Sequence, residues 1–228
     1  MGRHLALRLA DEGYDIALHY LNSRNDAERT AELIRQKKRK CAFFSADFSS
    51  PEKAGVLMDE VLEVFPDLSL LINSASVFDR VKTGQCGYDG LLKYFRINFF
   101  SPFLLSETYF GKCSGGHVIN ILDTKINENS PDYGPYLLSK KALADYTRMC
   151  ALNYAPDFRV NGIAPGYILP PVLDGSPSVS DEGEKRIIPL QKKGSPEIIA
   201  DTMIFLLNND YITGNIIYAD GGQSVKNG

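Results

Sequence analysis

The stretch His117-Val118-Ile119-Asn120-Ile121-Leu122 is rich in β-branched residues and lacks the apolar–polar alternation of a half-exposed strand. This pattern is typical of a parallel strand that is buried on both faces. Other short apolar runs resemble it, at 14–20, 41–46, 68–73, 159–164 and 216–218. We therefore expect a sheet built of buried parallel strands.

Longer segments with helical periodicity separate these runs, at 4–12, 26–38, 51–65, 88–110, 136–154 and 196–207. Alternation of strand and helix predicts an α/β fold, a Rossmann-like doubly wound parallel sheet with helices on both faces. The chain has 228 residues, of which 44% are hydrophobic and 23% charged. That composition provides one sizeable core, so we expect a single domain over residues 1–228.

The beginning of the chain departs from this fold class. Met1-Gly2-Arg3 runs directly into a predicted helix, whereas a doubly wound nucleotide-binding domain opens with a strand and a glycine-rich turn. Gly2 would be only the last glycine of such a turn. We expect a domain that is N-terminally incomplete; the alternative is a fold that manages without this strand. That alternative would leave two buried strand edges unpaired.

Composition argues against several classes of partner. The formal net charge of -3 provides no electrostatic footprint for nucleic acid, and the basic run at 37–40 fits a solvated helix end. The four cysteines show no Cys-x-x-Cys pairing, so neither a disulfide framework nor a metal site is expected. We found no apolar run of membrane-spanning length and no signal-peptide pattern, and we expect a cytoplasmic protein.

The segment Tyr136-Leu137-Leu138-Ser139-Lys140 places a phenol and an ammonium four residues apart, on one face of a helix. A buried ammonium beside a phenol favours the phenolate, which predicts a lowered pKa for Tyr136. Such a tyrosine can give a proton to a carbonyl or imine as hydride arrives. The spacing alone is a weak signal, because an accidental pair on a surface helix would look the same.

The surrounding motifs strengthen the signal. Asp123 follows the strand at 117–122, Asn98 lies in the preceding helix, Pro165-Gly166 follows the next strand, and Asp220-Gly221-Gly222 follows the last. With several motifs in this order, the sequence resembles the short-chain dehydrogenase/reductase family. The resemblance extends from Gly2 to about residue 225. The resemblance implies that Tyr136 is the proton donor and that Lys140 binds the nicotinamide ribose. It also implies that Asn98 supports a proton-relay water.

Two motifs resemble one subgroup of that family, the pteridine reductases. Asp123 stands where most members have a catalytic serine, and Asn73-Ser74-Ala75-Ser76-Val77-Phe78 resembles the subgroup's loop after the next strand. The resemblance implies that Ser76 contacts the cofactor and that Phe78 stacks on a pterin, an arrangement that offset stacking favours. Asp123 could donate a hydrogen bond only if burial kept it protonated. The substrate-binding set is then Ser76, Phe78, Asp123 and Tyr136.

The resemblance also implies NADPH as cofactor. His19-Tyr20-Leu21-Asn22-Ser23 resembles the segment after the second strand of the family, and Arg24 could replace the subgroup's phosphate-binding arginine, whose place Asn22 takes. No acidic residue ends this strand, which favours NADP over NAD. Asp47 resembles the adenine-contacting residue, or is a turn residue before Pro51. The other expected cofactor contacts are Gly2, Asn73, Ala75, Ser76, Tyr136, Lys140, Pro165 and Gly166.

Two further expectations concern the loop and the assembly. Residues 165–195 are rich in Gly, Pro and Ser with little periodicity, which favours a substrate lid. Family resemblance implies a homotetramer in which the helices at 88–110 and 136–154 pack across an interface.

Together these features predict an NADPH-dependent oxidoreductase that reduces a pterin or dihydrofolate-type substrate. One alternative is a general carbonyl or 3-oxoacyl thioester reductase of the same family. The other is a catalytically inactive scaffold or binding relative, because backbone amides of the missing turn normally hold the cofactor's pyrophosphate.

Overall fold

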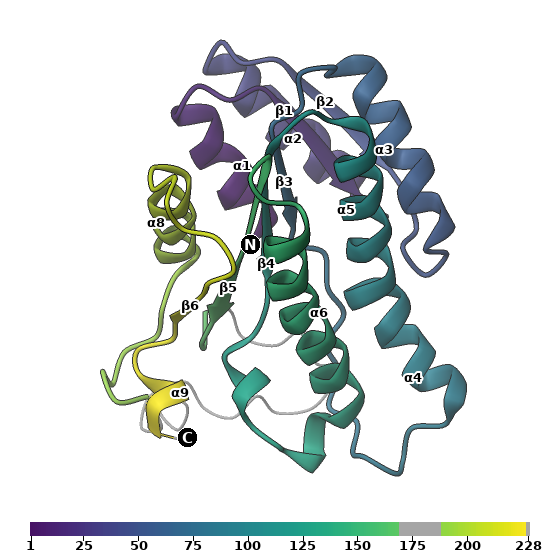
Figure 1. Ribbon diagram of the computed structural model, residues 1–228, viewed down its shortest axis with the longest axis vertical. Coiled ribbons are helices and arrows are strands. Elements are labelled where there is room, and N and C mark those ends of the chain that lie inside the picture. Colours follow the sequence, from purple (N-terminus) through teal and green to yellow (C-terminus); the bar gives the residue numbers. More distant parts are fainter. Residues whose placement is uncertain (169–187, 227–228) are drawn as a thin grey trace.

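The computed structural model describes residues 1–168 and 188–226, and these form alternating helices and strands (Figure 1). The strands are β1 (Ile16–Tyr20), β2 (Cys41–Ser45), β3 (Leu70–Asn73), β4 (Gly116–Ile121), β5 (Phe158–Pro165) and β6 (Ile216–Ala219). The helices are α1 (Gly2–Asp11), α2 (Arg24–Gln36), α3 (Glu52–Val64), α4 (Tyr88–Phe95), α5 (Ser101–Lys112), α6 (Gly134–Asn153), α8 (Pro196–Leu207) and α9 (Gln223–Lys226). The α/β fold class predicted from the sequence is confirmed.

All strand pairs are parallel, but the strands form two separate sheets. β1 pairs with β2, whereas β3, β4, β5 and β6 form a second sheet in that order. The central strand β4 pairs Ile119 with Asn161 of β5 and with Ile72 of β3. Within β4, Val118, Ile119 and Asn120 are completely buried, as the unbroken apolar stretch at 117–122 predicted.

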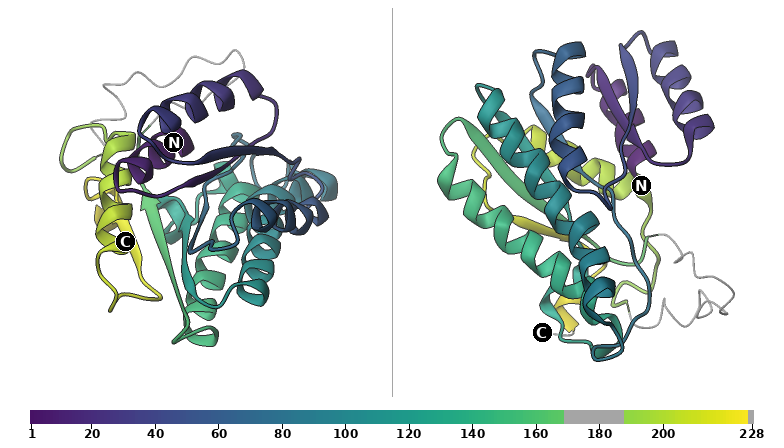
Figure 2. Two further views of the ribbon diagram at one scale, coloured as in Figure 1. Left: turned by 90° about the horizontal axis from the view of Figure 1, so that it is seen from above. Right: turned by 90° about the vertical axis from the view of Figure 1, so that its right-hand side faces the viewer.

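Helices cover both faces of the strands, as a doubly wound fold requires (Figure 2). One apolar core lies against α1, α2 and α8 and includes Leu5, Ile34 and Met203. The other lies against α3, α5 and α6 and includes Tyr109 and Leu143. The two cores fix the strand ends to which the polar residues of the site are attached.

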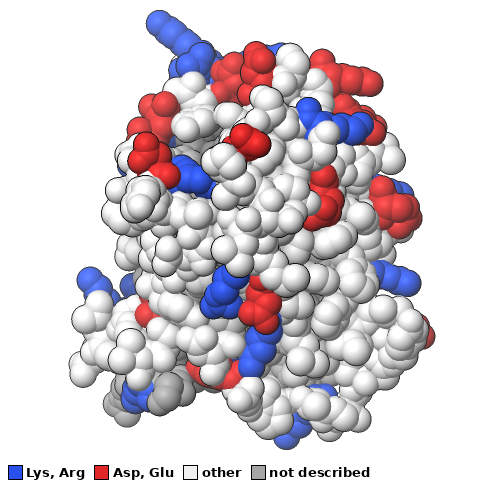
Figure 3. Space-filling view, in the orientation of Figure 1, with Lys and Arg blue, Asp and Glu red and all other residues white. Residues whose placement is uncertain are grey.

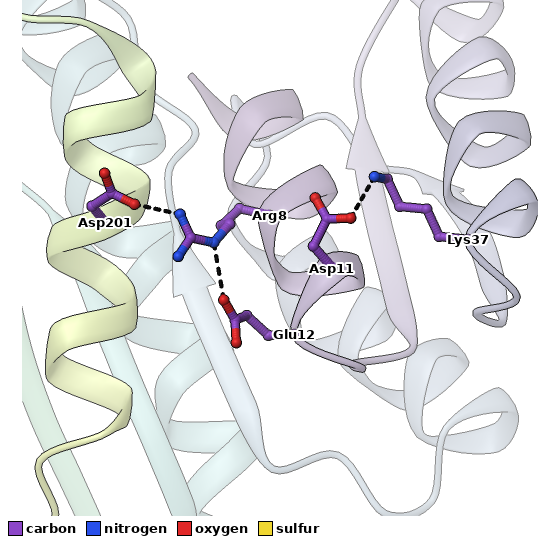
Figure 4. A network of polar contacts seen from close by, with 5 residues as sticks. All are labelled: Arg8, Asp11, Glu12, Lys37 and Asp201. Carbon is purple, nitrogen blue, oxygen red and sulfur yellow. Dashed lines mark hydrogen bonds and ion pairs between the residues drawn. The ribbon is translucent and has the colours of Figure 1, made fainter.

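Surface ion pairs connect the helices of the first face (Figure 4). Arg8 of α1 pairs with Glu12, which follows α1, and with Asp201 of α8. Lys37, which follows α2, pairs with Asp11 of α1. These side chains are partly or largely exposed, so each pair adds little to stability. The apolar contacts beneath them are the main support for α1.

A slot separates the two sheets. β1 and β3 are the facing edge strands, and no described strand lies between them. The slot is a cavity of about 600 Å³ whose lining includes Ala17, Leu18, Leu70 and Leu71. The slot thus divides the described strands into two sheets.

One predicted helix has a different form. The segment 88–110 is divided into α4 and α5 by a π-helical turn, η1 (Arg96–Phe100). Such a turn inserts one extra residue into the helical ladder and is frequent at functional sites. Here it contains the fully buried Asn98. Hydrophobic periodicity could not show this, because the apolar face continues through the turn.

The outer surface carries charges of both signs. On the face drawn in Figure 3, acidic and basic side chains are interspersed. Among residues 1–168 and 188–226, no helix is long and apolar enough to cross a membrane. Of the loop predicted as a lid at 165–195, residues 169–187 lie outside the described residues.

Candidate active site

The structure brings the predicted catalytic residues together. Asp123 follows β4, and Tyr136 and Lys140 lie on the first turns of α6. The Tyr136 hydroxyl donates a hydrogen bond of 2.7 Å to Asp123 Oδ2, and the backbone N–H of Lys125 donates one of 2.8 Å to Asp123 Oδ1. Lys140 is buried, and its Nζ donates to the carbonyl oxygen of Ile121 at 2.9 Å. A phenol, a carboxyl group and an ammonium therefore meet at the carboxyl end of β4.

The protonation behaviour differs from the expected one. Burial raises the pKa of Asp123 and, together with the Asp123 carboxylate, raises the pKa of Tyr136 well above its ordinary value. Burial lowers the pKa of Lys140 to about 8. The expectation of a lowered Tyr136 pKa is wrong for this structure, because the phenol donates to a carboxylate while the ammonium binds a carbonyl oxygen. Tyr136 is held as the neutral, proton-carrying form.

Asn98 anchors the loop after β3. Its Oδ1 accepts from Ser76 Oγ at 3.1 Å and from the Val77 N–H at 2.9 Å, while its Nδ2 donates to the Val77 carbonyl at 3.0 Å and to Ser139 Oγ at 3.1 Å. Both donors and both acceptor positions of the amide are used. The side chain is therefore a positioning element, and the expected support of a proton-relay water by Asn98 stays a prediction.

Phe78 lies against the catalytic tyrosine. Its ring meets the Tyr136 ring edge-on at 4.8 Å and stacks on Tyr133 at 5.3 Å. The Lys125 ammonium lies 4.2 Å from the centre of the Tyr133 ring. Phe78 is thus part of an aromatic group next to Tyr136. The stacking of Phe78 on a flat substrate ring stays a prediction.

The residues predicted to contact the adenosine half of a cofactor lie beyond the ends of β1 and β2. Asn22, Ser23 and Arg24 are exposed, and Arg24 pairs with Glu28. Asp47 accepts from the Ser49 N–H at 2.9 Å, the turn geometry that was its alternative interpretation. The first turn of α1 has no acidic residue, and the first turn of α2 has one, Asp26.

The ring contacts of β1 are internal. His19 stacks on Phe48 at 4.2 Å and bonds the Ala46 carbonyl oxygen at 2.8 Å. Tyr20 packs edge-on against Phe43. The structure thus assigns both side chains contacts within the protein, and the residues that follow them, Leu21 to Arg24, are exposed.

The remaining predicted contacts surround the end of β3. Gly2 lies close to Ser74, and Ala75 and Ser76 are exposed. Asn73 is buried, and its amide donates to Asn120 Oδ1 at 2.8 Å. Asn73 therefore connects β3 to β4 and does not reach the exposed surface of the site.

The chain after β5 is fixed by the last strand. The N–H of Gly166 donates to the Ala219 carbonyl, and a Cβ on Gly166 would lie 2.7 Å from Asp220 Cα. Pro165 ends β5. Only glycine fits this approach, which explains the Pro-Gly turn.

Sequence reasoning missed the positioning role of Asp220. This buried carboxylate accepts from Thr124 Oγ1 and from the N–H groups of Gly222 and Ser224. It thus links the last turn of the chain to the residue after Asp123. The motif Asp220-Gly221-Gly222 was noted, but its partner 96 residues earlier could not be found from spacing.

Comparison with known protein families found a match over most of the chain. The family model described as Enoyl-(Acyl carrier protein) reductase matches residues 1–224. The chain belongs to the short-chain dehydrogenase/reductase family. The fold, the Tyr136–Lys140 pair and the matched length agree, and the chain is accordingly an oxidoreductase of this family.

Relatives in the family have diverse activities. A 3-oxoacyl-[acyl-carrier-protein] reductase of Staphylococcus aureus is 28% identical over 98% of this chain and 93% of its own length. An uncharacterized oxidoreductase of Bacillus subtilis is 26% identical over 99% of this chain and 81% of its own length. Sequence identity at this level supports the family and leaves the substrate open.

Among solved structures, FolM alternative dihydrofolate reductase 1 from Brucella suis, in complex with NADP, is 29% identical with a TM-score of 0.89. The match covers 98% of this chain and 90% of that one. A blue fluorescent protein from a metagenomic library, in complex with NADPH, is 25% identical with a TM-score of 0.89, covering 98% and 94%. In the described part of the present chain, no group of three or more His, Cys, Asp or Glu side chains could hold a metal ion.

Proposed function

We propose that this protein is an NADPH-dependent reductase of a pterin or dihydrofolate-type substrate. The observation that carries the proposal is the 2.7 Å hydrogen bond from Tyr136 to Asp123 in a site bounded by the Phe78 ring. The similarity to a dihydrofolate reductase crystallised with NADP supports both the substrate class and the cofactor.

The residues fit the nicotinamide half of such a cofactor. Lys140 is buried with its ammonium directed at the Ile121 carbonyl, at the carboxyl end of β4, where cofactors bind in open α/β sheets. Gly166, directly after β5, provides a close backbone approach to Asp220. Arg24, at the start of α2, is the cation that would hold a 2′-phosphate. The cofactor, when bound, supplies hydride to the substrate ring.

The protein's own residues supply the proton. Tyr136 holds its proton because burial and Asp123 raise its pKa, so the phenol is a donor and not a phenolate. Asp123, whose pKa is also raised, can return a proton to Tyr136 or pass one to the ring nitrogen of a substrate. A serine at position 123 could polarise a carbonyl, whereas the carboxyl group of Asp123, whose pKa burial raises, can also take up and release a proton. This difference favours a heterocyclic substrate with basic nitrogens.

The test uses the purified chain with NADPH and, separately, dihydrobiopterin, dihydromonapterin, dihydrofolate and an acetoacetyl thioester. Oxidation of NADPH with a pterin or folate, and slower or no oxidation with the thioester, is expected. The thioester arm represents the second candidate, which the similarity to 3-oxoacyl reductases favours. Binding of NADPH without turnover of any of the four would contradict the proposal. Absence of NADPH binding would point to the inactive binding relative.

A further inference from the structure

The side chain of Lys125 lies beside Asp123 of the candidate active site. Lys125 belongs to a short 3-10 helix, η2 (Thr124–Asn127), which begins directly after Asp123. Its backbone N–H is the 2.8 Å donor to Asp123 Oδ1, so the Lys125 backbone is fixed against the carboxyl group. The residue is half-buried, and its side chain therefore lies at the boundary between the site and solvent.

A row of aromatic rings connects the Lys125 ammonium to Tyr136. The Tyr136 ring meets the Phe78 ring edge-on at 4.8 Å, and Phe78 stacks on Tyr133 at 5.3 Å. The Lys125 ammonium lies 4.2 Å from the centre of the Tyr133 ring. Tyr136 is buried, whereas the other three residues are half-buried. The row thus runs from the buried Tyr136 outward to a positive charge at the rim of the site.

Lys125 differs from the other cations near this rim, because it is not neutralised by an ion pair. Arg80 and Lys82 both pair with Asp132, at 3.3 and 3.9 Å. In the part of the chain that the structure describes, no carboxylate forms an ion pair with Lys125, and its ammonium has the Tyr133 ring as its neighbour. A ring face attracts an ammonium but leaves its three hydrogen-bond donors available.

A ring next to an ammonium without an ion pair indicates the chemistry of the group that would bind there. A folate-type substrate carries a benzoyl ring and two carboxylates beyond its pterin ring, whereas the side chain of a reduced biopterin carries only hydroxyl groups. With the pterin ring against Phe78, the benzoyl ring would pass along Tyr133 and a carboxylate would meet Lys125. A hydrogen bond between two charged groups is stronger than one to a neutral hydroxyl.

We propose that Lys125 binds a carboxylate of the substrate's tail and thereby selects dihydrofolate-type substrates over pterins with uncharged side chains. This role rests on the proposed function, because it requires a pterin ring against Phe78 and next to Tyr136. It distinguishes between the two substrate types that the proposed function includes. Tyr133 is a positioning residue, since its ring holds the ammonium at the rim.

Equilibrium binding tests this role without requiring turnover. Isothermal titration calorimetry in the presence of NADP measures the Kd of dihydrofolate and of dihydrobiopterin for the unaltered protein, Lys125→Met and Lys125→Arg. Methionine removes the charge but keeps the backbone N–H that bonds Asp123. The matched control is Lys112→Met, an exposed lysine at the end of α5, where the chain approaches the amino end of β4.

Steady-state kinetics separate this role from an effect on Asp123. Burial raises the pKa of Asp123, and the Lys125 ammonium is one of the charges that oppose this rise. Removal of that charge would therefore change kcat for every substrate. Loss of a carboxylate contact would instead raise KM for the substrate with the charged tail only.

Lys125→Met is expected to raise the Kd of dihydrofolate about 5- to 20-fold, the loss implied by one partly exposed charged hydrogen bond, and that of dihydrobiopterin less than about twofold. Lys125→Arg should retain most of the affinity for dihydrofolate, because it keeps the charge. Added salt should weaken dihydrofolate binding to the unaltered protein more than to Lys125→Met, since ions screen an exposed charge pair. Lys112→Met should leave both Kd values unchanged.

Three outcomes separate this role from the proposed function. Equal changes of both Kd values in Lys125→Met, or no change in either, overturn the role of Lys125 and leave the reductase function intact. If neither compound binds the unaltered protein, the role and the function both fail. If both bind, with the selective loss in Lys125→Met, but NADPH reduces neither, the role of Lys125 stands and the proposed function fails.

Discussion

The hydroxyl of Tyr136 donates a 2.7 Å hydrogen bond to Oδ2 of Asp123, from the first turns of α6 to the end of β4. The two groups are 13 residues apart in the chain, yet their pKa values depend on each other. Burial raises the pKa of both groups. Through the hydrogen bond, Asp123 raises the pKa of Tyr136 further, and Tyr136 lowers the pKa of Asp123. The pair is a proton-holding unit, and its chemistry can be tested one group at a time.

Asp123→Ser is expected to reduce the kcat for pterin reduction by about 100-fold, because a serine has no carboxyl group that can take up and release a proton. The affinity for NADPH should change much less. Steady-state kinetics and fluorescence titration with NADPH separate the two effects. Equal losses in both would argue against a proton-handling role for Asp123.

Tyr136→Phe is expected to reduce kcat by about 100-fold or more, since it removes the proton donor and leaves the ring in place. The matched control is Tyr211→Phe, at a fully exposed position, which should leave kcat unchanged. Kinetics of both variants under one set of conditions are compared. A kcat for Tyr136→Phe within twofold of the unaltered protein would exclude Tyr136 as the donor.

Asn98→Ala is expected to lower the free energy of unfolding by about 2–4 kcal/mol, because the N–H and C=O of Val77 lose their buried partner. Asn209→Ala, at an exposed amide, should cost well under 1 kcal/mol. Urea unfolding measures both. The substrate KM should also rise in Asn98→Ala, since the loop that bears Phe78 is released, and an unchanged KM would contradict the positioning role.

Phe78→Leu should raise the KM for a pterin by about 3- to 10-fold, the loss expected when an aromatic stacking partner is removed. The KM for an acetoacetyl thioester, which has no flat ring, should change little. Phe205→Leu, an exposed aromatic on α8, is the control. Equal increases for pterin and thioester would show that Phe78 supports the site without selecting the substrate.

The buried Lys140 makes stability depend on pH. Its pKa is lowered from 10.5 to about 8 in the folded protein, so between these values the unfolded state binds more protons than the folded state. The free energy of unfolding therefore rises with pH across this window, by up to about 3 kcal/mol. Below pH 8 the destabilisation by the buried ammonium is fully present and does not change with pH.

The variant Lys140→Met lacks this titration. Urea unfolding of the unaltered protein and of Lys140→Met at several pH values from 7 to about 10.5 isolates the contribution of Lys140. The free energy of unfolding of the unaltered protein should rise more with pH than that of Lys140→Met. Parallel curves over the whole range would mean that the ammonium is not destabilised by burial.

The sequence alone predicted the local elements well. The apolar stretch at 117–122 is β4 in all but its bounds, and the helix expected at 196–207 is α8. These predictions succeed because burial on both faces leaves an unbroken apolar run, and exposure on one side leaves helical periodicity. The π-turn at 96–100 was not predictable, because it depends on where Asn98 must point and not on hydrophobic pattern.

The site was predictable as a set of residues but not as a set of contacts. Motif spacing identified Asp123, Tyr136 and Lys140, which the structure brings to the end of β4. It gave the wrong direction for the Tyr136 pKa, and it could not show the hydrogen-bond partners of Asn98 and Asp220. Those depend on which polar atom a side chain meets after folding, and bonds such as Thr124 to Asp220 join residues far apart in the chain.

By itself, the sequence determined the α/β class, the family resemblance and the residues at the catalytic position, because periodicity and motif order are local properties of a chain. Only the tertiary structure decided how those residues are protonated and bonded, since burial and long-range contacts set pKa values. Only the structure, too, could show that β1 and β3 face each other across a slot. Strand order and the division into two sheets are properties of the folded chain, because they depend on contacts between residues far apart in the sequence.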